Sequence, residues 1–205
     1  MKTIKAILFD LGNVIIRFDA AIFEKGLEPF GRIEDGKIVD YLMESYYVNR
    51  YMEGRLTASQ FYTKTRKRFG LKIKFNEFFR IWNSIFFPYP EMEEIVKRLK
   101  ERHPEIKLVL ISNTNLEHYE FLKKDYEVLS LMDECVVSHE VGRIKPHPAI
   151  FNEALKAAGT LPKDTFYTDD REDLIEAARV MGIKAFQFVG HEELRKQLAK
   201  FGVAV

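Results

Sequence analysis

The chain has 205 residues and 46% hydrophobic side chains, enough for one domain or for one domain that carries an insert. Its 32 basic and 31 acidic residues leave a net charge of +1, so no overall field favours nucleic acid or an anionic membrane. The single cysteine, Cys135, excludes an internal disulfide framework, and no apolar stretch approaches the roughly 20 residues that span a bilayer. We therefore expect a soluble cytoplasmic protein without nucleic-acid or membrane partners.

The first predicted element is a buried strand over residues 4–10, where an apolar run ends abruptly in a carboxylate. Ile7-Leu8-Phe9 leads into Asp10, and a glycine turn follows at Gly12. Open α/β sheets bind their ligands at the carboxyl ends of the strands. Asp10 is therefore the first candidate functional side chain.

The next segment, residues 19–87, is rich in aromatic residues and shows no clear strand. Its aromatic side chains recur at near-helical spacing, and Thr57 to Gln60 match the capping box that starts a helix at Ala58. We expect most of these aromatics to fill the interior of a small helical bundle and a few to line a substrate pocket. Because the bundle is inserted after the first strand, it is expected to form a lid over Asp10.

Short apolar runs alternate with amphipathic helical stretches through the second half of the chain. The predicted strands are 107–112, 134–138, 165–169 and 184–189, and the predicted helices are 91–102, 116–123, 148–158, 173–181 and 192–201. Such alternation predicts an α/β fold, in which helices cover both faces of a Rossmann-like parallel sheet. This core would comprise residues 1–18 and 88–205, with 19–87 as an α-helical cap inserted after the first strand.

Polar residues follow four of these strands and should meet at one edge of the sheet. They are Asp10, Ser112-Asn113-Thr114, Lys145-Pro146 in the loop after the third strand, and Asp169-Asp170 with Asp173 one turn later. Carboxylates from two strand ends are ligands that suit Mg²⁺, while hydroxyl, amide and ammonium groups can bind phosphate oxygens. Asp10 can then attack phosphorus and form an aspartyl-phosphate. The set predicts phosphoryl transfer from a small phosphorylated metabolite.

These motifs together resemble those of the haloacid dehalogenase superfamily, in the branch with a helical cap after the first motif. They are Phe9-Asp10-Leu11-Gly12-Asn13-Val14, Ser112-Asn113-Thr114, Lys145-Pro146, and Asp169-Asp170 with Asp173. The motifs are specific as a set and span nearly the whole chain. Within the superfamily, a subgroup of sugar-phosphate phosphatases resembling bacterial α-glucose-1-phosphatase is similar in the first motif and at Asn115 and His118.

The resemblance implies a role for each matching residue. Asp10 would be the catalytic nucleophile, acting with Ser112 and Lys145. Mg²⁺ would be bound by Asp10, Asp170 and the backbone carbonyl of Gly12. The supporting acids would be Asp169 and Asp173, and the phosphate-binding residues would be Leu11, Gly12, Asn113 and Lys145.

The chain departs from the superfamily at Gly12, where most of its phosphatases carry an acid. That acid protonates the leaving oxygen and then activates water, and such groups contribute typically about 10²–10⁴-fold. Three explanations stay open: a leaving group that is easy to expel, such as an anomeric oxygen; another proton donor, such as His118 or a cap residue; or little phosphatase activity. We favour the first explanation.

The sequence thus predicts a Mg²⁺-dependent phosphatase that hydrolyses a small phosphate monoester, with a sugar phosphate favoured. A 2-haloacid dehalogenase shares the fold and the nucleophile but uses no metal. The adjacent carboxylates of Asp169 and Asp170 argue against it, because they would repel each other without a cation. A weakly active or non-catalytic module that binds a phosphorylated ligand or a protein is the other alternative. The sequence sets no oligomeric state.

Overall fold

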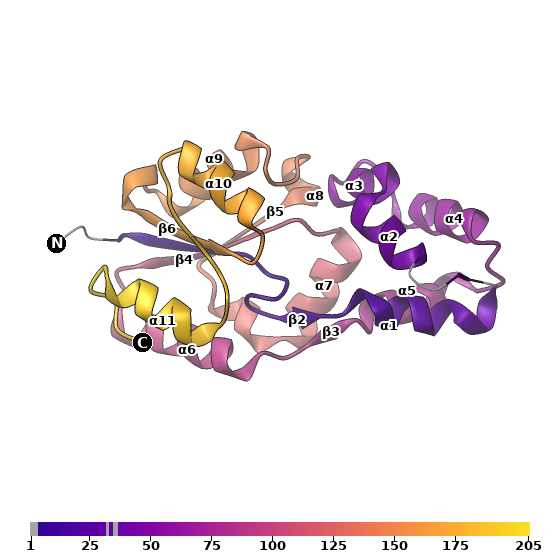
Figure 1. Cartoon of the computed structure of the whole chain (residues 1–205), viewed down its shortest axis with the longest axis horizontal. Helices are drawn as coiled ribbons and strands as arrows, with labels where there is room; N and C mark the ends of the chain where they lie inside the picture. The colour runs from indigo at the N-terminus through magenta and orange to yellow at the C-terminus, as the bar shows by residue number, and fades with distance from the viewer. Residues whose placement is uncertain (1–3, 32, 35–36) are drawn as a thin grey trace.

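A computed structural model describes residues 4–31, 33–34 and 37–205 (Figure 1). Five parallel strands form one sheet in the order β5-β4-β1-β6-β7. They are β1 (Ala6–Phe9), β4 (Lys107–Ser112), β5 (Glu134–Val137), β6 (Thr165–Asp169) and β7 (Lys184–Gln187). Since β1 lies in the middle between β4 and β6, the residues that follow these three strands are neighbours at the carboxyl edge.

Helices cover both faces of this sheet, as the sequence predicted. One face is covered by α6 (Pro90–Arg102), α7 (Leu116–Asp125) and α11 (His191–Ala199), and the other by α9 (Pro148–Ala158) and α10 (Glu172–Val180). Alternate residues of β1 enter the two apolar cores: Ile7 and Phe9 face one, Ala6 and Leu8 the other. The α/β architecture with a Rossmann-like sheet is therefore confirmed.

Shorter elements complete this part of the chain. They are the helix α8 (Ser138–Val141) and two 3₁₀ turns, η2 (Glu127–Leu131) and η3 (Pro162–Asp164). The sequence predicted residue 138 as the end of a strand, but a helix begins there, and it is followed by the C-cap residue Gly142, whose left-handed φ of 75° suits glycine. No helix in the part of the chain that the structure describes is both long and apolar enough to cross a membrane.

The inserted segment is helical. It contains α1 (Ala20–Leu27), η1 (Glu28–Phe30), α2 (Lys37–Glu44), α3 (Tyr46–Met52), α4 (Ala58–Arg68) and α5 (Phe75–Asn83). The capping box is confirmed, because the Thr57 hydroxyl accepts from the Gln60 N–H at 3.2 Å and the Gln60 side chain accepts from the Thr57 N–H at 2.9 Å. Phe23, Phe61 and Trp82 pack together in a third apolar core of their own.

A two-stranded antiparallel ribbon joins this helical segment to the sheet. Its strands, β2 (Arg17–Phe18) and β3 (Phe86–Phe87), are the two places where the chain crosses between the parts. The sequence missed both strands, since two residues carry no periodicity. The expected domain division at 18/19 and 87/88 coincides with the ends of the ribbon and stays a prediction; residues 1–3, 32 and 35–36 lie outside the described residues.

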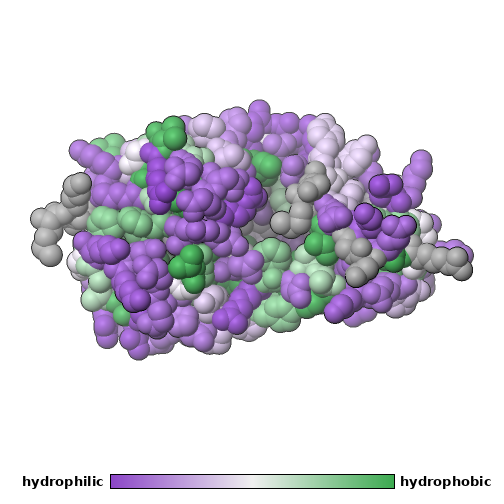
Figure 2. Space-filling view, viewed as in Figure 1, coloured by the Kyte–Doolittle hydropathy of each residue, from purple (hydrophilic) through white to green (hydrophobic). Residues whose placement is uncertain are grey.

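The helices α1 to α5 lie beyond the carboxyl edge of the sheet, on the side where the strands end (Figure 1). The face shown in Figure 2 is mainly hydrophilic, with apolar residues in small separate patches.

Candidate active site

Asp10 directly follows β1 and is 9% exposed. Its backbone N–H donates to the Thr168 carbonyl at 3.0 Å, which extends the β1–β6 pairing and fixes the position of the carboxylate. The Asp10 Oδ1 accepts a hydrogen bond from Lys145 Nζ at 2.6 Å. Burial raises the pKa of the Asp10 carboxyl, the Lys145 ammonium opposes this rise, and the neighbouring Asp169 carboxylate adds to it.

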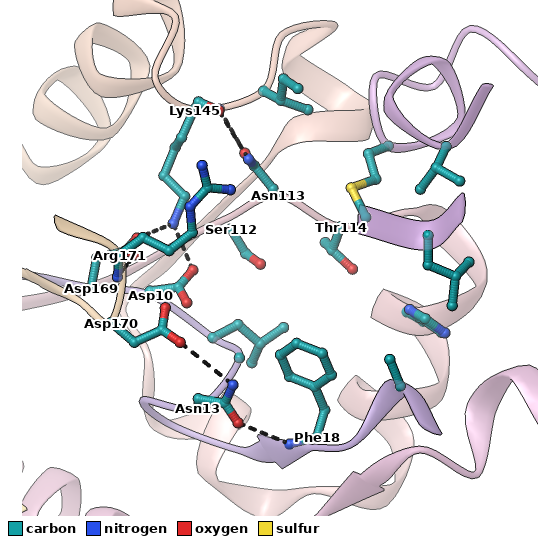
Figure 3. Close-up of a pocket in the computed structure, with 18 of the residues that line it drawn as sticks. Asp10, Asn13, Phe18, Ser112, Asn113, Thr114, Lys145, Asp169, Asp170 and Arg171 are labelled. Atoms are coloured by element: carbon teal, nitrogen blue, oxygen red, sulfur yellow. Dashed lines mark hydrogen bonds and ion pairs between the residues drawn. The ribbon is translucent and has the colours of Figure 1, made fainter. Parts of the chain in front are cut away.

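Lys145 is fully buried, and all three of its ammonium hydrogens have acceptors. Besides Asp10, the ammonium donates to Asp169 Oδ2 at 2.6 Å and to the Ile111 carbonyl at 3.1 Å. Burial disfavours the charged ammonium, but the two carboxylates outweigh this effect and raise the pKa of Lys145. The ammonium is therefore a fixed positive charge against the candidate nucleophile (Figure 3).

Asn113 holds the backbone of Lys145 in this position. Its Oδ1 accepts from the Lys145 N–H at 2.6 Å, and its Nδ2 donates to the Lys145 carbonyl at 3.1 Å. The peptide between Lys145 and Pro146 is cis. The side chain of Asn113 is thus engaged in positioning the lysine, and its backbone N–H is the group that remains for a phosphate oxygen. Ser112, at the end of β4, directs its hydroxyl into the cavity beside Asp10 (Figure 3).

Asp169 and Asp170 join Asp10 in one acidic cluster. One ligand oxygen from each of the three carboxylates lies within 4.8 Å of the others. Asp169 is buried, and it accepts hydrogen bonds from Lys145, from the Tyr167 hydroxyl and from the Arg171 N–H at 3.0 Å. When all three carboxylates are ionised, they leave a net charge of −2 against the one ammonium, which a divalent cation would balance.

Asp173 is not brought to this cluster. It is exposed and forms a bidentate pair with the Arg171 guanidinium, at 2.6 Å to Nη2 and 3.1 Å to Nε. No hydrogen bond or ion pair joins Asp173 to Lys145 among the described residues, and the role of Asp173 as a supporting acid stays a prediction. Asp173 instead orients Arg171, a residue that lines the cavity and that the motifs did not single out.

Gly12 lines the cavity beside Leu11, and the ring of Phe18 fills the space next to it. A Cβ atom built on Gly12 would lie 2.8 Å from Phe18 Cε1 and 3.0 Å from Cδ1. Asn13 adopts a left-handed conformation, with φ of 58°, and its side chain links Phe18 to the acidic cluster: Oδ1 accepts from the Phe18 N–H at 3.3 Å, and Nδ2 donates to Asp170 Oδ2 at 3.4 Å. The sequence did offer a signal for this turn, namely the asparagine that follows Gly12. Asparagine adopts the left-handed region more readily than most residues do.

His118 lines the cavity, and both of its ring nitrogens have hydrogen-bond partners. Its ring stacks on Trp82 at 4.3 Å, its Nε2–H donates to the Trp82 carbonyl at 3.0 Å, and its Nδ1 accepts from Asn115 Nδ2 at 3.2 Å. The carbonyl accepts only, which assigns the ring proton to Nε2. Burial lowers the pKa of His118 to about 3, so the ring is neutral. These contacts argue against the hypothesis that His118 replaces the missing acid, and the hypothesis stays a prediction.

The cavity between the sheet edge and the helical segment has a volume of about 470 Å³. On the sheet side the lining is mostly polar and includes Asp10, Asn13, Ser112, Asn113, Lys145, Asp169, Asp170 and Arg171. On the helical side the lining is mostly apolar and includes Phe18, Val48, Met52, Trp82, Ile85 and Phe86. Periodicity identified this segment as helical but did not select which of its side chains face the cavity, since that depends on how the helices pack.

A family model described as a haloacid dehalogenase-like hydrolase matches residues 4–182. The chain belongs to this family. The match includes all four motifs and the inserted helices, so the resemblance expected from the sequence is confirmed, and the protein is a haloacid dehalogenase-like hydrolase.

Known relatives span nearly the whole length of this hydrolase. The D-ribitol-5-phosphate phosphatase of Bacteroides thetaiotaomicron is 24% identical over an alignment of 203 positions, which covers 95% of this chain and 97% of that protein. A haloacid dehalogenase family enzyme from the same organism, solved as a magnesium complex, is 25% identical with a TM-score of 0.79, covering 91% of this chain and 94% of that chain. A hydrolase of the same kind from Porphyromonas gingivalis has a TM-score of 0.82 at 21% identity, covering 99% and 100%.

Proposed function

We propose that this hydrolase is a Mg²⁺-dependent phosphatase that hydrolyses a small phosphate monoester through an aspartyl-phosphate on Asp10. The observation that carries the proposal is the buried Asp10 carboxylate, whose Oδ1 is bound by Lys145 at a strand end that opens on the cavity. The D-ribitol-5-phosphate phosphatase and the magnesium complex among the relatives support it. Within the monoesters, the sequence favours a sugar phosphate.

The residues present fit a magnesium ion. Asp10, Asp170 and the backbone carbonyl of Gly12 would hold it, and Asp169 would support the site through its contacts with Lys145 and Arg171. The bound ion supplies positive charge that stabilises the phosphoryl oxygens. The excess of two negative charges in a buried cluster is the feature of this chain that calls for a cation.

The side chains provide the parts that phosphoryl transfer needs. Lys145 binds Asp10 Oδ1, so Oδ2 is the oxygen placed to attack phosphorus. The Ser112 hydroxyl and the backbone N–H groups of Leu11 and Asn113 are available to donate to the phosphoryl oxygens. The bond between Asp10 and phosphorus forms as the ester bond breaks; water then cleaves the aspartyl-phosphate and releases inorganic phosphate.

We also propose that residues 19–87 act as a cap that closes over the substrate. The buried Ser138 hydroxyl donates to the Met52 carbonyl at 2.6 Å, and His118 donates to the Trp82 carbonyl. Both hydrogen bonds run from the sheet side to the helical side of the cavity. They support a closed arrangement in which water is excluded from the ester bond.

The test compares Asp10→Asn with the wild-type protein in assays of phosphate release from p-nitrophenyl phosphate and from a panel of sugar phosphates. Asp10→Asn is expected to be inactive and folded, and EDTA is expected to abolish wild-type release. Asp125→Asn, an exposed change on α7, is the matched control and should retain activity. Normal turnover by Asp10→Asn refutes the nucleophile, and halide release from a 2-haloacid without Mg²⁺ would instead support a dehalogenase.

A further inference from the structure

The polar side chains that line the cavity differ in how deeply they are buried. Asp10, Ser112 and Lys145 are buried, so a phosphoryl group held between them lies at the closed end of the cavity. Asn49, on α3, and Arg171, in the loop after β6, line the same cavity but are exposed. The organic part of a bound phosphate ester therefore points toward the end of the cavity at which Asn49 and Arg171 lie.

Most of the other polar side chains on the lining already have hydrogen-bond partners within the protein. They are Asn13, Trp82, Asn113, Thr114, His118 and Lys145. Ser112 and the three carboxylates of the acidic cluster face the phosphoryl group and the cation in the proposed reaction. Hydroxyl groups on the organic part of a substrate therefore need other partners, because a buried hydroxyl without a hydrogen bond lowers the affinity.

The amide of Asn49 is free to act as such a partner. It forms no hydrogen bond to another group within residues 4–31, 33–34 and 37–205. The other α3 residues that line the cavity, Val48 and Met52, are apolar, so Asn49 supplies the polar contact on this helix. A side-chain amide both donates and accepts, and it can therefore bind a hydroxyl group in either direction.

Arg171 offers hydrogen-bond donors on the sheet side of the cavity. Two N–H groups of its guanidinium, at Nε and Nη2, bind Asp173 at 3.1 Å and 2.6 Å. This pair orients the guanidinium, which points from the loop after β6 toward the cavity (Figure 3). A guanidinium has five N–H groups, so those that do not bind Asp173 can donate to the oxygen of a hydroxyl group. The ammonium of Lys145, the other cationic group among the described residues of the lining, has no hydrogen left for this purpose.

We propose that Asn49 and Arg171 determine the specificity of this hydrolase by binding hydroxyl groups on the organic part of the substrate from the two sides of the cavity. Asp173 is the positioning residue for Arg171. The inference rests on the proposed function and deepens it, because it assigns the residues that distinguish a polyhydroxylated phosphate ester from an apolar one of the same size. The rest of the helical side is mostly apolar and contacts the carbon skeleton.

The first experiment measures kcat/KM of the wild-type enzyme with Mg²⁺ for pairs of esters. A hexitol 6-phosphate is paired with n-hexyl phosphate and a pentitol 5-phosphate with n-pentyl phosphate, so that the members of a pair differ only in hydroxyl groups. We expect the hydroxylated ester to be preferred by about tenfold or more in at least one pair, since a hydrogen bond to a charged group contributes about this factor. Turnover of p-nitrophenyl phosphate without any such preference overturns the inference alone. No phosphate release from any ester, including p-nitrophenyl phosphate, overturns the proposed function and the inference with it.

Variants at the two positions test the role of each residue. The ratio of kcat/KM between the hydroxylated and the alkyl ester should fall by about 2- to 10-fold in Asn49→Leu, and by about 10-fold or more in Arg171→Met, where a charged donor is lost. The controls are Asn76→Leu on α5 and Arg98→Met on α6, which lie outside the lining and should keep the wild-type ratio. Both esters are assayed in one preparation, so a loss of folded protein lowers both values and leaves the ratio unchanged. A wild-type ratio in Asn49→Leu or in Arg171→Met overturns the role of that residue.

A double-variant cycle tests Asp173. Asp173→Ala should lower the ratio in the wild-type background and have no further effect in Arg171→Met, because its contribution passes through the guanidinium. Equal losses in the two backgrounds would show that Asp173 acts separately from Arg171 and would contradict its role as the positioning residue.

Discussion

Replacing Lys145 by methionine removes an ammonium that the acidic cluster contacts directly. The side chain of Lys145 is 1% exposed, and its partners Asp10 and Asp169 lie at 2.6 Å with side chains 12% and 1% exposed. Breaking a buried ion pair by removing one partner typically costs about 3–5 kcal/mol, because the remaining charge is left uncompensated. Here two carboxylates lose the same partner, so we expect a loss of stability of this order in metal-free protein at pH 8.

The loss should depend on pH in a defined direction. Without the ammonium, which lowers the pKa of Asp10, the pKa of this buried carboxyl in the folded state rises further above its ordinary value, so between pH 4 and pH 8 the folded variant binds more protons than the unfolded chain. Its free energy of unfolding therefore falls as pH rises through this range. Relative to the wild-type protein, Lys145→Met should be destabilised much less at pH 5 than at pH 8. Added Mg²⁺ should recover part of the difference at pH 8.

Urea unfolding in EDTA at pH 5 and pH 8 measures both effects. Lys156→Met is the control, since Lys156 forms an exposed pair with Glu153 at 3.0 Å and its removal should change stability little. A Lys145→Met variant as stable as the control at pH 8 would show that the lysine does not compensate the buried carboxylates. A loss that is the same at both pH values would show that packing, and not charge, is responsible.

Two further predictions concern the contact between the cap and the sheet. Gly54→Ala should lower the Tm and raise KM more than Gly70→Ala does. Both glycines have left-handed φ values, which cost an L-residue about 1–2 kcal/mol. Of the two, Gly54 is the one at which a Cβ atom would also meet a carbonyl, that of His139 at 2.3 Å. Equal effects in the two variants would argue against a tight contact there. His118→Gln should keep the shape of the pH profile of kcat/KM between pH 5 and 8. The wild-type ring, with its pKa of about 3, does not titrate in that range. If one limb of the profile were lost in the variant, His118 would instead be a proton donor.

The sequence predicted those parts of the site that stand at the ends of long regular elements. Asp10, Lys145 and Asp169 converge because the strands before them are buried and parallel. Such strands can be recognised in the sequence as short apolar runs. The pairing of Asp173 with the exposed Arg171 could not be predicted, because Arg171 lies two residues earlier, just before α10, where periodicity gives no direction. The burial of His118 depends on Trp82, 36 positions earlier, and on the packing of α5 against α7.

Phe18 illustrates the same limit at the most informative position. Gly12 marked a missing acid, but nothing in the sequence indicated that an aromatic ring takes its place. That placement depends on a ribbon of two residues per strand, whose partner is 68 positions away at Phe86. Elements this short are stabilised by tertiary contacts and carry no hydrophobic pattern of their own.

The ribbon of β2 and β3 also has a consequence for how this architecture can vary. The chain leaves the sheet at Arg17 and returns at Phe87, and these two residues are direct partners in the ribbon. Because both ends of the inserted segment meet in this two-stranded ribbon, here called the stalk, the length of the segment can change with little effect on the geometry of the sheet. Doubling a loop closed in this way costs only about 0.6 kcal/mol in closure entropy. The stalk therefore allows the helical segment to be exchanged for a larger or smaller one, while Phe18, which belongs to the stalk, stays with the catalytic edge.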